Sequence, residues 1–136
     1  MRHTLIMLLL VIGCTPATEP APTAPAVVGT WTVRSINDST LPYVWAETLT
    51  DTHRIKAESL VFHPTGTFRQ VSVSGVLSHP TMFEVIESTA TRTGSYSVAG
   101  DTVTLSMTGG VVWSGTRSGN RLTMVKMGRA FAYEHQ

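Results

Sequence analysis

The chain has 136 residues, with ten lysine and arginine side chains against nine aspartates and glutamates. This balance argues against nucleic-acid binding, which needs a basic face. The sequence also contains no run of lysines or arginines that would predict attraction to anionic lipids. The single cysteine, Cys14, excludes an internal disulfide and a metal site built on two cysteines.

The first thirteen residues have the pattern of a secretory signal. Arg2 lies near the start, an apolar run covers 5–12, and the small residue Gly13 stands before the expected cleavage point. A membrane-spanning helix needs about 20 apolar residues, so this run is too short to predict a transmembrane anchor. We expect residues 1–13 to be removed from the mature protein.

The end of this segment, Val11-Ile12-Gly13-Cys14, resembles the lipobox of bacterial lipoproteins, in which leucine is more usual than Val11. The resemblance implies that Cys14 carries a diacylglycerol group and becomes the new N-terminus. Acyl chains contribute about 0.8 kcal/mol per buried CH₂, enough to hold a small domain on a membrane. The expected location is therefore the bacterial cell envelope. If the cell is Gram-negative, Thr15 in place of aspartate resembles the signal for the outer membrane, facing the periplasm or the cell surface.

Residues 14–26 predict a tether between the lipid and the folded domain. The segment TPATEPAPTAPA holds four of the seven prolines and almost no large apolar side chain. Because proline fixes φ and removes a backbone donor, we expect an extended conformation. Cleavage after residue 13 would remove one of the ten basic side chains, Arg2, and leave nine against nine acidic ones.

Residues 27–136 predict one all-β domain, because apolar side chains alternate with threonine, serine and arginine rather than recurring every three to four residues. We expect strands near 29–36, 56–63, 67–76, 82–89, 92–98, 102–107, 111–117, 121–127 and 130–135. The sequence does not decide the conformation of segment 37–55. Pro42, Tyr43 and Trp45 fit an edge strand, a loop or a short helix over one end of a barrel.

Glycine-centred turns set the expected topology. Gly66, Gly100-Asp101 and Gly119-Asn120 each precede a predicted strand and supply the positive φ of tight hairpin turns. Neighbouring strands are then antiparallel and joined in sequence order. Eight or nine such strands remove their exposed edges by closing into a small up-and-down barrel.

Two motifs resemble the lipocalin-like domains of bacterial envelope proteins: Gly29-Thr30-Trp31 in the first strand, and Gly94-Ser95-Tyr96-Ser97-Val98 followed by Gly100-Asp101. The resemblance implies a small apolar ligand inside the barrel. The side chains that would line its site are Trp31, Phe68, Tyr96, Leu105, Trp113 and Met124. Their alternative role is to fill a small barrel completely. The arginine expected to pack across Trp31 has three candidates, Arg117, Arg121 and Arg129.

Catalytic and cofactor motifs are absent from the sequence, so we expect no enzyme activity and no cofactor. Asp51 and His53, joined by His63 or His79, offer a conceivable metal site, but solvated loop histidines are the favoured interpretation. Glu84 and Glu87 are three residues apart on a predicted strand, which places them on opposite faces.

These observations favour a lipid-anchored, lipocalin-like β-barrel that binds a small hydrophobic ligand. The alternative is a protein-binding module of the envelope, a hydrolase inhibitor or an assembly factor, with a filled interior. Such a module would use the loops expected at 37–55 and 76–83, where Tyr43, Val44, Trp45, Met82 and Phe83 are apolar.

The lipid anchor is testable by metabolic labelling with a fatty acid. We expect the wild type to incorporate the label and Cys14→Ser to lose it, because the thiol is the acceptor of the lipid. Equal labelling of the two proteins would contradict the lipobox interpretation.

Overall fold

The computed structural model describes residues 26–136, which form ten antiparallel β-strands. Their bounds are β1 (Gly29–Ile36), β2 (Ser39–Thr40), β3 (Tyr43–Glu47), β4 (Asp51–Phe62), β5 (Thr67–Ser78), β6 (Phe83–Ala99), β7 (Thr102–Met107), β8 (Val112–Ser118), β9 (Arg121–Lys126) and β10 (Arg129–His135). Within these residues there is no helix that is long and apolar enough to cross a membrane.

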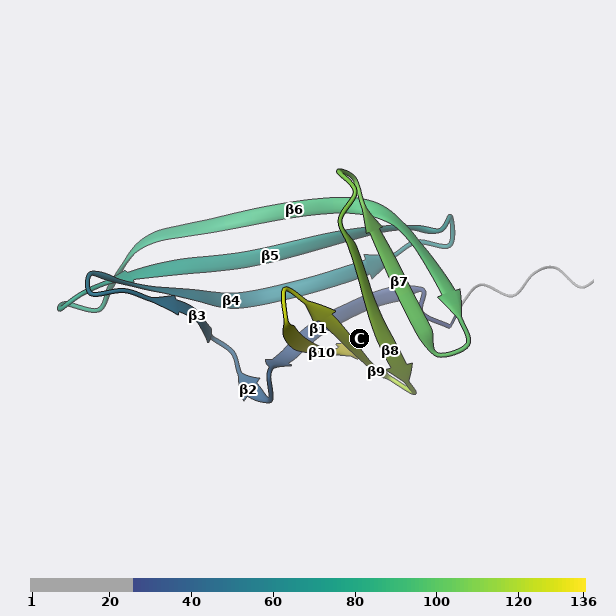
Figure 1. Ribbon diagram of the computed structural model, residues 1–136, viewed down its shortest axis with the longest axis horizontal. Helices are drawn as coiled ribbons and strands as arrows, with labels where there is room; N and C mark the ends of the chain where they lie inside the picture. Colours follow the sequence, from purple (N-terminus) through teal and green to yellow (C-terminus); the bar gives the residue numbers. More distant parts are fainter. Residues whose placement is uncertain (1–25) are drawn as a thin grey trace, which may run out of the picture.

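Eight of the strands close into a barrel (Figure 1). From β4 to β10 each strand pairs with its successor, and β1 closes the sheet by pairing with β10 on one side and with β4 on the other. The short strands β2 and β3 lie outside this ring. The expected small, antiparallel, lipocalin-like barrel is thereby confirmed.

The predicted turns connect these strands. Gly66, Gly100 and Gly119 all have positive φ, at 81°, 59° and 59°. Gly100 and Gly119 begin the two-residue turns that join β6 to β7 and β8 to β9. Because glycine adopts positive φ without a steric penalty, these turns fix the register of the strands on either side.

The core occupies the closed part of the barrel and follows the alternation seen in the sequence. The buried apolar side chains include Trp31, Val33, Leu60, Phe62, Val103, Leu105, Leu122, Met124, Phe131 and Tyr133. The Trp31 indole Nε1 donates to the Val27 carbonyl over 2.7 Å, and the His135 ring meets the Trp31 ring edge-on. The polar atom of this large side chain is therefore paired, as burial requires.

Strands β4, β5 and β6 are the longest and project beyond the barrel at the left of Figure 1. β6 is continuous from Phe83 to Ala99, whereas the sequence predicted two strands at 82–89 and 92–98. That prediction was wrong because residues 89–91 contain no turn-forming residue and pair with β5 throughout. The loop expected at 76–83 contracts to residues 79–82, since β5 continues to Ser78.

Segment 37–55 forms two short strands, β2 and β3, and the first five residues of β4, which begins at Asp51 rather than near residue 56. The edge-strand alternative is therefore confirmed for β2 and β3, and the short helix is not adopted. Asn37 and Asp38 make the turn between β1 and β2 with φ of 48° and 62°. The Asn37 side-chain oxygen also accepts from the Ala130 amide over 2.9 Å. β3 then pairs with the first part of β4 and widens the sheet at the open end.

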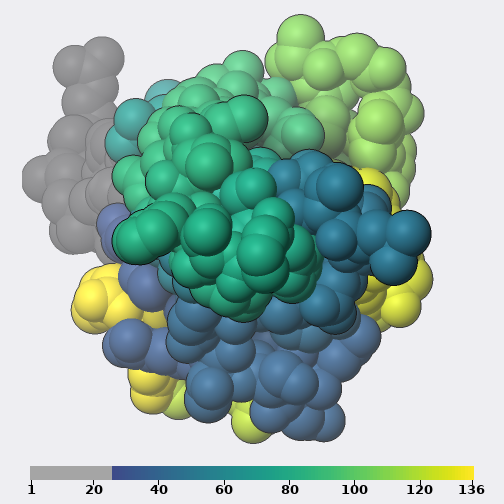
Figure 2. Space-filling model, turned by 90° about the vertical axis from the view of Figure 1, so that its left-hand side faces the viewer, coloured from purple at the N-terminus to yellow at the C-terminus, as the bar shows by residue number. Residues whose placement is uncertain are grey.

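We call the far end of this extension the tip, defined by Leu49, Met82 and Phe83. The β3–β4 and β5–β6 turns lie side by side here, because the His79 amide donates to the Thr50 carbonyl over 2.7 Å. Figure 2 views the molecule from this end. The side chains of Leu49 and Phe83 are 99% and 72% exposed, so the tip is an apolar surface.

One edge of the extension is unpaired within residues 26–136. Only residues 94–99 of β6 pair with β7, whereas residues 83–95 pair with β5. Residues 83–93 therefore have a neighbouring strand on one side alone. The predicted signal, Cys14 and the tether up to residue 25 lie outside the residues that the structure describes.

The close packing around β6 is testable at Gly94, which pairs with Phe68 of β5 and with Met107 of β7. A Cβ at Gly94 would collide with the Ser106 carbonyl oxygen and lie 2.9 Å from the Phe68 ring. We expect Gly94→Ala to lower the free energy of unfolding by about 2–3 kcal/mol, measured by urea denaturation. Exposed Ser95→Ala is the matched control, and an equal effect of both substitutions would contradict this packing.

Candidate functional site

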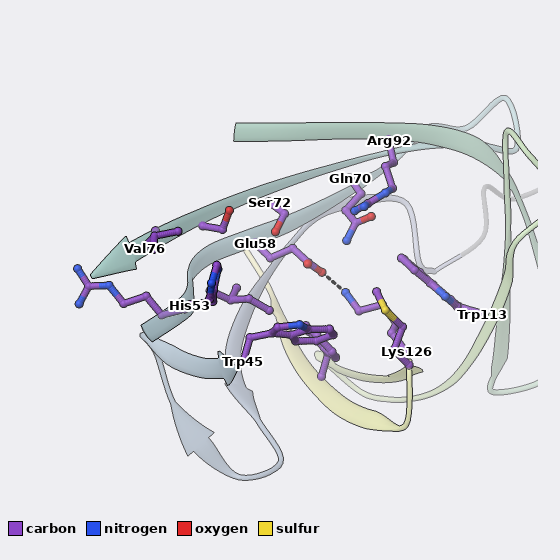
Figure 3. A pocket seen from close by; sticks show the side chains of 15 residues that line it. Trp45, His53, Glu58, Gln70, Ser72, Val76, Arg92, Trp113 and Lys126 are labelled. Carbon is purple, nitrogen blue, oxygen red and sulfur yellow. Dashed lines mark hydrogen bonds and ion pairs between the residues drawn. The ribbon is translucent and has the colours of Figure 1, made fainter. Parts of the chain in front are cut away.

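The described residues enclose a cavity of about 260 Å³ at the open end of the barrel, where the β3–β6 extension meets the ends of β8, β9 and β10 (Figure 3). Its lining residues are Trp45, His53, Arg54, Ile55, Glu58, Gln70, Ser72, Ser74, Gly75, Val76, Arg92, Trp113, Lys126, Met127 and Phe131. We call this space the mouth cavity. Its size is slightly below the usual range for small-molecule sites, which begins at about 300 Å³.

Strand register explains which side chains reach the mouth cavity. On β5, Gln70, Ser72, Ser74 and Val76 alternate, so all four point to the same face. On β4, the β-bulge at Lys56 changes the alternation. Glu58 pairs with Ser72 and Ile55 with Ser74, so two residues three positions apart both face inward.

Three aromatic rings form the apolar side of the mouth cavity: Trp45, Trp113 and Phe131. Trp45 is held from outside by Arg129, whose guanidinium carbon lies 3.9 Å from the centre of the indole ring. The same guanidinium donates to the Trp45 carbonyl over 3.3 Å. Arg129, one of the three arginines expected to pack across Trp31, thus packs on Trp45 instead, and the ring against Trp31 is that of His135.

The floor of the mouth cavity is a buried polar network of Glu58, Lys126 and Tyr133. Lys126 donates hydrogen bonds to Glu58 and Tyr133, and the Tyr133 hydroxyl donates to Glu58. The three side chains come from β4, β9 and β10, and each is 4% exposed or less. The Lys126 ammonium also lies 3.6 Å from the centre of the Phe131 ring. Each charge therefore has a polar partner inside the barrel.

Burial dominates the titration of this network. It lowers the pKa of Lys126 to about 8, although Glu58 raises that pKa and Arg92 lowers it further. Burial and the neighbouring Glu58 carboxylate raise the pKa of Tyr133 well above its ordinary value. Near neutral pH the lysine is therefore closer to losing its proton than an exposed lysine is.

Gln70 and Arg92 are two of the other polar residues that line the mouth cavity. Gln70 is 1% exposed, and its Oε1 atom has no hydrogen-bond partner within the described part of the chain. Arg92 reaches the cavity from β6, next to Gln70 in Figure 3, and these two residues occupy paired positions on β6 and β5. A buried acceptor without a partner is uncommon in native proteins, so Gln70 marks a place where a ligand or water would be stabilised.

The six residues predicted to line a ligand site separate into three groups. Trp113 lines the mouth cavity. The structure places Trp31, Phe68, Leu105 and Met124 in the packed core at 1% exposure or less. Half-buried Tyr96 packs edge-on against Phe62, and its hydroxyl donates to the His63 carbonyl near the closed end. The barrel is thus filled in its closed half and open at its mouth.

The histidines considered as metal ligands do not gather in one place. Within residues 26–136 no group of three or more His, Cys, Asp or Glu side chains is arranged to hold a metal ion. His79 hydrogen-bonds to the Thr52 hydroxyl over 2.9 Å, while Asp51 accepts from Thr50. His63 and His79 lie in turns, as expected of loop histidines, whereas His53 lies on β4 and lines the mouth cavity.

Glu84 and Glu87 lie on the same face of β6, so their predicted placement on opposite faces was wrong. The pairing of Leu77 with Glu84 and of Val76 with Ile86 leaves Val85 as a bulge, which adds one residue between the two acids. Both carboxylates bind Lys56, Glu84 over 3.0 Å. The hydrogen bonds that Lys56 donates to Glu87 and Glu84 raise the pKa of Lys56.

The sequence contained a signal for the polar residues that the prediction of the site missed. Glu58 stands two positions before buried Leu60, Lys126 two positions after Met124, and Gln70 two positions after Phe68. Each continues the inward alternation of its strand with a polar side chain. Extending the alternation past its last apolar residue would have placed all three inside the barrel.

Comparison with known proteins gave no family model, no curated protein and no solved structure that matches this chain.

The buried lysine has a testable effect on stability. The pKa of Lys126 is about 8 in the folded protein, against an ordinary value of 10.5. Between these values the unfolded chain binds more protons, so the free energy of unfolding should rise with pH, by about 2 kcal/mol from pH 8 to pH 10. Well below pH 8 both states are protonated and this contribution no longer changes.

Urea denaturation at several pH values measures this rise. Lys126→Met should abolish it, whereas Lys56→Met, the control at the other lysine, should retain it. If the free energy of unfolding of Lys126→Met rises with pH by the same amount, the rise belongs to a titratable group other than Lys126.

Proposed function

We propose that this protein binds a small molecule with an apolar body and one polar group in the mouth cavity. The observation that carries this proposal is the unpartnered Gln70 acceptor, buried beside an open space that Trp45, Trp113 and Phe131 line. Small-molecule sites combine apolar walls with a few placed polar groups, and this cavity has both.

The cavity sets limits on the ligand. A volume of about 260 Å³ admits a molecule of roughly the size of a medium-length aliphatic chain or a small ring system. Its apolar part would lie against the aromatic rings, and its polar group would face Gln70 and Arg92. The packed core below the floor network prevents deeper entry.

We also propose that the domain is held in a bacterial envelope by a lipid on Cys14, which the sequence pattern supports. The geometry of the domain is compatible with this arrangement. The described chain begins beside the closed end, where Gly29 pairs with Phe62 at the end of β4. His53 and Ile55, which line the mouth cavity, lie near the start of β4. A lipid attached before residue 26 would therefore leave the mouth at the end of the domain away from the attachment.

A protein-binding role is the second candidate, and the tip is the observation that favours it. Leu49, Met82 and Phe83 gather on two adjacent turns, and apolar residues exposed in this way mark interaction surfaces. This role needs no open cavity. It becomes the better proposal if the mouth cavity takes up no small molecule.

The ligand proposal is testable with 1-octanol as the probe and tryptophan fluorescence as the readout, because Trp45 and Trp113 line the cavity. Ser72→Phe places a ring in the cavity and should weaken binding about tenfold or more. Val73→Phe is the matched control, since its side chain points to the opposite face of the same strand. We expect this control to bind octanol with nearly wild-type affinity.

Native mass spectrometry of the gently purified protein provides the complementary measurement. A bound apolar molecule in the wild type, lost in Ser72→Phe, would support the proposal and identify the ligand class. Absence of any octanol-induced change in wild-type fluorescence would contradict it.

A further inference from the structure

The chain contains two lysines, Lys56 and Lys126, and their surroundings are opposite. Lys56 lies on the outside of the sheet, bound to Glu84 and Glu87, and these hydrogen bonds raise its pKa. Lys126 lies inside the barrel, 2% exposed, on the floor of the mouth cavity. Burial lowers its pKa to about 8.

Aromatic rings surround the Lys126 amine. Its nitrogen is 3.6 Å from the centre of the Phe131 ring, 5.0 Å from that of Trp113 and 5.2 Å from that of Tyr133. Such rings attract the charged form, but they also keep bulk water away. A covalent adduct that water would hydrolyse is protected in this position.

Groups able to move protons lie in direct contact with the same nitrogen. Glu58 and Tyr133 are both hydrogen-bonded to Lys126, and to each other. An amine beside a positioned acid and base, at an apolar cavity, is the arrangement that activates lysine as a nucleophile toward carbonyl compounds. Figure 3 shows the amine directed toward Glu58.

We propose that Lys126 forms a reversible imine with an aldehyde that carries an apolar chain. The inference rests on the proposed ligand site and names the chemical class of its ligand. The aldehyde carbon would face the Lys126 amine, and its chain would lie along Trp113 and Trp45. The aldehyde oxygen would accept from Arg92, and the carbinolamine hydroxyl, or the water that it becomes, would donate to the unpartnered Gln70 Oε1. The aldehyde would stay covalently bound to Lys126 and would not be converted into another product.

The steps balance without an oxidant or reductant. Lys126 first gives one proton to the Glu58 carboxylate, and the free amine attacks the aldehyde carbon while the carbonyl electron pair moves to oxygen. A second proton passes from nitrogen to that oxygen, giving a carbinolamine. Glu58 then returns its proton to the hydroxyl, which leaves as water. The product is a protonated imine whose charge is balanced by the Glu58 carboxylate.

The test is reductive trapping with octanal and cyanoborohydride at pH 7, read by intact mass and by peptide mapping. We expect one octyl group on Lys126, formed more than about tenfold faster than on Lys56, because a lower pKa leaves more of the amine uncharged. Lys56 is the internal control, and peptide mapping also separates any label on the terminal amine. Prior incubation of the wild type with 1-octanol should slow the labelling of Lys126 about tenfold, and the substitution Ser72→Phe should do the same. Neither should change the rate at which Lys56 is labelled.

Lys126→Arg keeps the positive charge beside Glu58 but lacks a nucleophilic amine at neutral pH. It should lose the label on residue 126. If wild-type protein binds octanol but Lys126 is labelled no faster than Lys56, the imine is refuted and the ligand site stands. If wild-type protein binds no octanol and Lys126 is unlabelled, both proposals fail. The labelling rates of Lys126 and Lys56 in the wild-type protein test the imine even if Lys126→Arg does not fold.

Discussion

The closure of the sheet by β1 is the constraint on which the rest of this structure depends. β1 pairs with β10 through residues 31–36 and with β4 through residues 29–32, so one eight-residue strand joins the two ends of the meander. This double pairing places Trp31 inside the barrel against His135 and leaves the longer strands to extend past the ring. The mouth cavity exists because β4, β5 and β6 continue where the short strands β7 to β10 end.

The same strand register separates the inward-facing side chains into an apolar layer in the closed half of the barrel and a polar layer in the open half. The closed half is packed with aromatic and aliphatic side chains, whereas the open half has Glu58, Gln70 and Lys126 at the next inward positions. Burying charges is unfavourable unless they are paired, and a buried ion pair contributes little net stability. The network therefore places charged groups at the cavity floor without contributing much to the free energy of folding.

Much of the fold could be predicted from the sequence, because period-two alternation and glycine turns are local signals. The bounds of β1 and β7 agree with prediction, as do the hairpins at Gly100 and Gly119. The β-bulges at Lys56 and Val85 could not be predicted, since they result from pairing with a distant strand. They decide which side of the sheet Ile55, Glu84 and Glu87 occupy, which is why the candidate site was harder to foresee than the barrel.

The unpaired half of β6 has a consequence for how protein molecules behave toward one another in solution. An open strand edge offers backbone donors and acceptors to any extended chain, and native proteins limit this by placing charges and bulges there. β6 has both, in the bulge at Val85 and in the carboxylates of Glu84 and Glu87 that bind Lys56. Exposed ion pairs contribute little to stability. Their position on this edge instead opposes strand-by-strand aggregation, so these surface charges serve solubility.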